Sequence, residues 1–150
     1  MKQHQEKFYE IETLLRLKLG NRVVIEKEED KMFLYIQGND FWLSTDDTEF
    51  TVGYGMNHTH FSQDYNNLSE GISHVFDLLT NDVRKTLYKK GERIYKVITE
   101  IKYSDSRFIN IGTSTFLTFS FWKKTKTEIH YLSKVIEKSE IENDIKRILE

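Results

Sequence analysis

The chain has 150 residues, of which 38% are hydrophobic and 31% charged, a balance typical of a single folded domain spanning residues 1–150. It contains no cysteine, which excludes disulfides, thiolate chemistry and cysteine-based zinc sites, and it has no apolar run as long as a membrane helix. We therefore expect a cytoplasmic protein without a membrane partner, because the polar first residues do not resemble a signal peptide.

The first half of the chain predicts a helix followed by short strands. Apolar residues recur at helical spacing over residues 2–19, and Gly20 with Asn21 is typical of a helix end. Alternating runs separated by acidic or glycine-containing turns indicate an antiparallel meander. Its predicted strands are residues 22–26, 32–36, 40–44 and 49–54.

The second half predicts two helices and four more strands. An apolar stripe over residues 68–81 indicates a helix, with His74 on its solvated side, and a closing helix is expected over residues 140–149. Residues 115–122 are apolar on both faces and are therefore expected to form a central strand. The other predicted strands are residues 95–103, 107–111 and 127–132. The predicted fold is thus α+β, with a mostly antiparallel sheet in the order α-β4-α-β4-α.

The net charge of −2 conceals two oppositely charged stretches. Residues 26–64 contain nine acidic and two basic side chains, whereas residues 84–107 contain eight basic and three acidic ones. The acidic stretch suits a basic protein partner. The basic stretch contains tyrosines and could bind nucleic acid, but such alternation is also typical of the solvated face of a sheet, so nucleic acid is not the expected partner. Alternatively, the two stretches lie together and neutralise one another.

A His-x-His pair, His58 and His60, follows the fourth predicted strand. Residues two apart in extended backbone point to one side, so both imidazoles could reach one metal ion, with Asp64 as the nearest carboxylate. This arrangement favours a metal-dependent hydrolase as an alternative function. The motif of JAMM-type zinc proteases nevertheless fails at its third ligand, where Ile72 stands. We predict no cofactor and no bound metal.

A purely structural interpretation of the same pair is that it lies at a sheet edge and forms hydrogen bonds with backbone groups. Gly53 and Gly55 interrupt the segment before it, which favours a loop with a backbone bulge over a regular strand. The other histidines offer no site. His74 is expected on the solvated side of its helix, His130 alternates with apolar residues in a strand, and His4 lies in a terminus that is expected to fray.

The string from Asp46 to Phe61 combines an acidic turn, the strand sequence Glu-Phe-Thr-Val-Gly-Tyr-Gly and the loop His-Thr-His-Phe. With the helix that follows, the stretch from Phe41 to Leu79 resembles a segment of small α+β immunity proteins of bacterial polymorphic toxin systems. The resemblance implies a cytoplasmic, non-catalytic protein that neutralises a cognate toxin by binding it. The acidic segment would suit a basic toxin such as a nuclease domain.

The expected binding face consists of the acidic hairpin and the histidine loop. Its carboxylates would pair with lysine or arginine of the partner, and its aromatic side chains would supply buried contacts. The residues expected to contact the partner are Asp46, Asp47, Glu49, Tyr54, His58 and His60. An accessory protein of a phage or a secretion apparatus is a further possibility, and exposed strand edges permit a homodimer.

Overall fold

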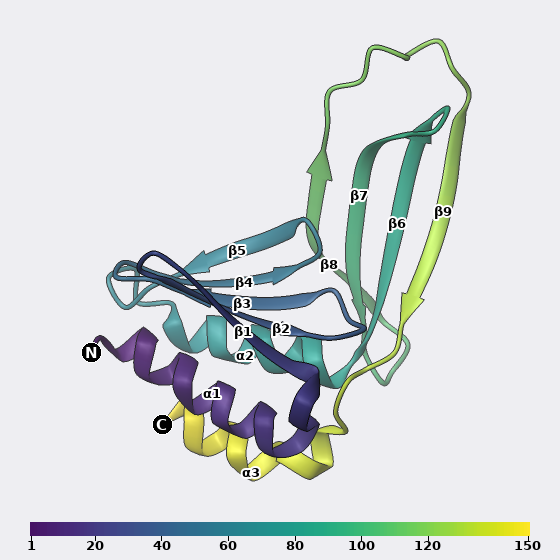
Figure 1. Cartoon of the computed structure of the whole chain (residues 1–150). Coiled ribbons are helices and arrows are strands. Elements are labelled where there is room, and N and C mark those ends of the chain that lie inside the picture. The colour runs from purple at the N-terminus through teal and green to yellow at the C-terminus, as the bar shows by residue number, and fades with distance from the viewer. The chain divides into compact units, whose positions relative to one another are not determined.

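The structure is a computed structural model that describes residues 1–150. It contains three helices and two antiparallel sheets, which confirms the α+β class (Figure 1). The chain divides into two compact units. The first comprises Met1–Thr80 and Val135–Glu150, and the second is Asn81–Lys134. None of the helices is both long and apolar enough to cross a membrane.

The first unit is a five-stranded antiparallel meander with helices on one of its faces (Figure 1). Its strands lie in sequence order, β1-β2-β3-β4-β5. The helices are α1 (Gln3–Leu19), α2 (Leu68–Thr80) and α3 (Lys138–Leu149), with a short 3-10 turn, Gly20–Arg22, after α1. The strands are β1 (Val23–Glu28), β2 (Lys31–Ile36), β3 (Phe41–Thr45), β4 (Phe50–Tyr54) and β5 (Asn57–Phe61).

The core of the first unit lies between this sheet and the helices. Leu34, Leu43 and Val52 occupy paired positions on adjacent strands and are fully buried. Their face of the sheet packs against α1 and α2, whose apolar stripes were expected from their spacing. Gly71 allows α2 to approach the sheet closely, since a Cβ atom there would lie 2.6 Å from the ring of Phe61. The first four strands of the meander and the helices that cover them are therefore as predicted.

The predicted loop after Tyr54 is instead a fifth strand. Gly55 adopts a φ of 59° and forms a two-residue turn with Met56, after which Asn57 pairs with Tyr54. A positive φ at the first turn position is what a tight hairpin requires, and glycine adopts it without strain. The pairing of β4 with β5 is regular, so the prediction of a bulge is wrong.

The second unit is a four-stranded antiparallel sheet in the order β8-β7-β6-β9. The guanidinium of Arg84 links three of its strands. It donates two hydrogen bonds to Glu100, at 3.1 and 3.0 Å, and lies 3.6 Å from the ring centroid of Phe108. The strands are β6 (Asp82–Lys90), β7 (Arg93–Lys102), β8 (Phe108–Thr115) and β9 (Thr125–Leu132).

The strand expected over residues 115–122 is absent apart from its first residue, which ends β8. Residues 116–124 instead connect β8 with β9 (Figure 1). The two inner strands of the sheet, β6 and β7, are already paired on both edges, so the sheet has no central position for this segment. Strand β6 was not predicted. The order is therefore α-β5-α-β4-α rather than α-β4-α-β4-α.

Candidate functional site

The face of the first sheet opposite the helices carries a row of five aromatic rings. Phe33 and Tyr35 of β2 are stacked with centroids 6.0 Å apart, and Phe33 lies 6.5 Å from Trp42 of β3. Trp42 lies 5.8 Å from His58 of β5, which lies 5.0 Å from His60. We call these five residues the aromatic row. The row is continuous although it draws on three strands.

The histidines join the row because the tight turn at Gly55 changes which alternate residues of the chain point to each face of the sheet. His58 lies opposite Gly53, and His60 lies opposite Thr51. Directly opposed residues in an antiparallel pair point to the same face. Both imidazoles therefore point away from the core and are exposed at an edge strand, as the sheet-edge interpretation predicts.

Gly53 provides the place where the row crosses β4. A Cβ atom at this position would overlap the indole of Trp42 at Cε2, Cζ2 and Nε1, so the ring lies directly on the strand backbone. The indole Nε1 donates a 2.9 Å hydrogen bond to the carbonyl of Gly55. The glycine pair predicted to form a bulge thus serves to seat Trp42.

The row is partly open to solvent and borders on negative charge. Phe33, Tyr35 and Trp42 are half-buried. Partial burial, together with the carboxylates of Glu26 and Glu28, raises the pKa of Tyr35 above its ordinary value. Overall, the first unit contains ten basic and nineteen acidic side chains, a net charge of −9. The aromatic face therefore belongs to a strongly acidic unit.

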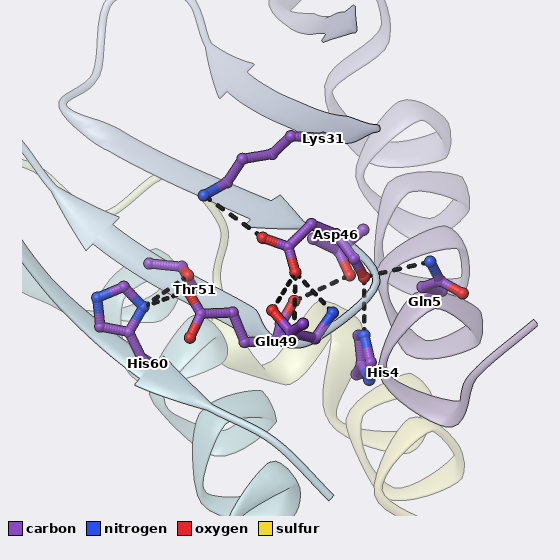
Figure 2. A network of polar contacts seen from close by, with 9 residues as sticks. His4, Gln5, Lys31, Asp46, Glu49, Thr51 and His60 are labelled. Atoms are coloured by element: carbon purple, nitrogen blue, oxygen red, sulfur yellow. Dashed lines mark hydrogen bonds and ion pairs between the residues drawn. The ribbon is translucent and has the colours of Figure 1, made fainter. Parts of the chain in front are cut away.

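The acidic turn beside the row is held by hydrogen bonds within the turn itself (Figure 2). The carboxylate of Asp46 accepts hydrogen bonds from the N–H and hydroxyl of Thr48, both at 2.7 Å, and from the N–H of Glu49 at 3.0 Å. Partial burial favours a higher pKa for Asp46, but these hydrogen bonds and Lys31, 3.7 Å away, outweigh it and lower the pKa. The Asp46 side chain therefore braces the turn, whereas Asp47 is exposed.

The first turn of α1 also holds this turn in place (Figure 2). His4 Nε2 lies 2.9 Å from the carbonyl oxygen of Asp46, and the Gln5 side-chain amide donates to the same oxygen at 3.2 Å. Lys2 donates to the carbonyl of Asp47 at 2.6 Å. His4 is buried in a helix that begins at Gln3, so the prediction of a fraying terminus is wrong. Because a carbonyl only accepts, Nε2 of His4 must carry a proton.

His60 is anchored by one of its two ring nitrogens. Its Nδ1 lies 2.7 Å from Glu49 Oε1 and 3.1 Å from the hydroxyl of Thr51 (Figure 2). A carboxylate at this pairing distance accepts, so Nδ1 donates and the Thr51 oxygen is a second acceptor. No group of three or more His, Cys, Asp or Glu side chains is placed to hold a metal ion. The arrangement suits a contact surface in which Nε2 remains available.

Two predicted side-chain environments are wrong. Tyr54 is fully buried, and burial with the charge of Asp40 raises its pKa well above the ordinary value, so it belongs to the core and offers no surface to a partner. His74 is half-buried against Phe61, with ring centroids 6.2 Å apart, rather than solvated. Burial lowers the pKa of His74.

Sequence reasoning did not select Phe33, Tyr35 or Trp42, which complete the row. Their signal lies in the parity of the predicted strands, since each alternates with a buried neighbour such as Leu34 or Leu43. Large aromatic residues on both faces of a strand indicate that the second face also has a role. The residues that lie together are therefore Glu49, His58 and His60 from the predicted set, with these three aromatic residues.

No family model, curated protein or solved structure matches the chain. The fold and the site define an α+β protein with an open, aromatic and acidic sheet face.

Proposed function

We propose that the chain is a non-catalytic binding protein that neutralises a cognate bacterial toxin domain, that is, an immunity protein. The aromatic row is the observation that carries the proposal. Tryptophan and tyrosine are the residues that most often dominate binding energy in protein interfaces, and contiguous exposed apolar surface on a folded protein marks contact sites. Trp42 and Tyr35 are half-buried and held in place, so little side-chain entropy is lost when a partner covers them.

The charge of the first unit indicates the kind of partner. A net charge of −9 with Glu26 and Glu28 beside Tyr35 favours a partner surface rich in lysine and arginine. Complementary charge speeds association and selects against acidic surfaces. A toxin domain that acts on nucleic acid presents such a basic surface to its substrate. The acidic face would inhibit it by occupying that surface.

The proposal is tested by affinity purification from a host that expresses the candidate toxin, followed by co-expression with the captured toxin domain. The test variant is Tyr35→Ala combined with Trp42→Ala. The control is Tyr65→Ala, which removes an exposed tyrosine outside the row. We expect the wild type and the control to retain a toxin-domain protein and to restore growth, while the double variant does neither.

Each result has a distinct meaning. A toxin domain that the double variant still retains would place the interface elsewhere on the protein. A partner that is not a toxin but is lost in the double variant would support the binding face and refute the immunity function. Growth arrest that persists despite a saturating amount of the wild-type protein would also refute neutralisation.

A further inference from the structure

The connection between β8 and β9 exposes four large apolar side chains within six residues. Leu117, Phe119, Phe121 and Trp122 are 84, 71, 76 and 70% exposed. The intervening residues are half-buried, so exposure alternates along the extended segment up to Phe121. Single exposed apolar residues are ordinary on protein surfaces, but a cluster of this size indicates a contact site.

This segment lies with the β6–β7 hairpin at one end of the second sheet. A Cβ atom on Gly91, in the hairpin turn, would lie 2.8 Å from the side chain of Lys123, and Lys90 donates a 2.6 Å hydrogen bond to Thr125. We call residues 89–96 and 116–128 the tip of the second unit. The tip therefore combines the four exposed apolar side chains with the hairpin turn.

The tip is strongly basic. It contains seven basic and two acidic side chains, a formal excess of five positive charges. Lys89 and Lys126 pair with the two acids, whereas Arg93, Lys123 and Lys124 are exposed and have no carboxylate partner. The second unit as a whole contains twelve basic and five acidic side chains, a net charge of +7.

We propose that this tip binds the surface of an anionic phospholipid bilayer. Leucine, phenylalanine and tryptophan side chains partition into the boundary between headgroups and acyl chains, and adjacent lysines contact anionic headgroups. Such peripheral attachment needs no spanning helix, so it is compatible with the finding that no helix could cross a membrane. The site shares no residue with the aromatic row, and the proposal does not depend on the immunity function.

Two features favour a bilayer over single-stranded nucleic acid, the other ligand that suits aromatic and basic residues. Leu117 has no π face on which a base could stack. The rings of Phe121 and Trp122 lie at 83° to one another and do not form a common stacking platform. Both features are compatible with insertion into an apolar liquid, which does not demand parallel rings.

The test is flotation of the full-length protein with vesicles of phosphatidylcholine alone or mixed in equal parts with phosphatidylglycerol. We expect binding to the anionic vesicles that weakens as salt is added, since salt screens the headgroup charge. Neutralising Lys123 and Lys124 by alanine should weaken binding about 25-fold, at roughly five-fold per charge near an anionic surface. Replacing Leu117, Phe119 and Phe121 together by serine should abolish it.

The matched control is Leu17→Ser, which removes a side chain that is 78% exposed on α1 of the other unit and should leave binding unchanged. Trp122 provides a second readout that does not depend on the triple variant. Its emission should shift to shorter wavelength on anionic vesicles, and the shift should vanish in Trp122→Phe, in which Trp42 is the only tryptophan.

Absence of binding to the mixed vesicles would overturn the proposal, as would undiminished binding of the triple variant. Equal binding to neutral vesicles would overturn the assigned role of the basic side chains. If the triple substitution instead abolishes binding of a single-stranded oligonucleotide, or a dimer seen by sedimentation, while vesicles are not bound, the tip serves that other ligand and the proposal fails.

Discussion

Replacing Gly53 by alanine should destabilise the protein by displacing Trp42. The methyl group would overlap the indole at three ring atoms, and the opposite side of the site is strand backbone, so the ring must move. Alanine itself is compatible with the extended conformation of β4, since Gly53 does not have a positive φ. In the folded state, the destabilising effect of the substitution therefore comes from the displaced ring.

The expected cost follows from the contacts of Trp42. Loss of the hydrogen bond from Nε1 to Gly55 contributes about 1 kcal/mol. Re-exposure of roughly 70 Å² of the ring contributes about 1.5–2 kcal/mol at about 25 cal/mol per Å². Alanine restricts the unfolded chain and returns about 0.5–1 kcal/mol. The net loss of unfolding free energy is therefore about 2 kcal/mol.

Urea denaturation followed by circular dichroism measures this loss. A double-mutant cycle with Trp42→Ala isolates the overlap, because Gly53→Ala has no indole to displace in that background. We expect the penalty to disappear there, or to become a small gain. An equal penalty with and without the indole would refute the reasoning, and so would a neutral Gly53→Ala in the wild-type background.

Three further predictions concern groups that stabilise the interior of one unit or the other. Substituting alanine for His4 removes a buried donor to the Asp46 carbonyl and should cost about 2 kcal/mol in urea, whereas an unchanged midpoint would show that the contact contributes nothing. Burial lowers the pKa of His74, so the unfolded chain binds more protons than the folded one as the pH falls. The stability that the neutral His74 contributes is complete above the unfolded pKa of about 6.5, and it declines as the pH falls through that value toward the lower folded pKa. His74→Gln should flatten the decline of the urea midpoint between about pH 7 and pH 5, and parallel profiles would contradict this assignment. Arg84→Lys keeps the charge but loses the bidentate geometry and the contact with Phe108, so a loss of about 1 kcal/mol is expected, and a change no larger than that of an exposed Arg93→Lys control would disprove it.

Local periodicity was sufficient for the helices and for the first four strands. Each of these elements has one apolar face, and the spacing of that face differs between helix and strand. The acidic and glycine-containing turns then fixed the meander, because short connections join antiparallel neighbours. Element type follows from the sequence wherever the pattern within one element decides it.

The errors occur where distant residues decide the outcome. Strand β6 carries four basic residues and forms because β7 and β9 pair with it on both edges. Residues 115–122 look like a buried strand, yet β6 and β7 already fill the central positions of the sheet, and most of the large apolar side chains of the segment remain exposed. The burial of His4 depends on a carbonyl 42 positions along the chain. None of these partners can be recognised from a local window of sequence.

Only part of the site could be predicted from the sequence, because distant residues also decide its geometry. His58 and His60 were selected because the pair is conspicuous, but the side of the sheet to which they point depends on a tight turn at Gly55, where the sequence predicted a loop with a bulge. Trp42 became part of the site only through the register that sets it over Gly53. Cross-strand register, rather than composition, assembles the aromatic row.

The division of charge between the units explains why the net charge of −2 is a poor guide to partners. Salt limits electrostatic attraction to about 8 Å at physiological ionic strength, so a partner that docks on one unit responds to the charges within that distance and not to the total. A basic protein would meet a unit of charge −9, and an anionic bilayer would meet the basic tip of a unit of charge +7. Added salt should therefore weaken both proposed interactions, and charge reversal within either docking surface should weaken the interaction made there.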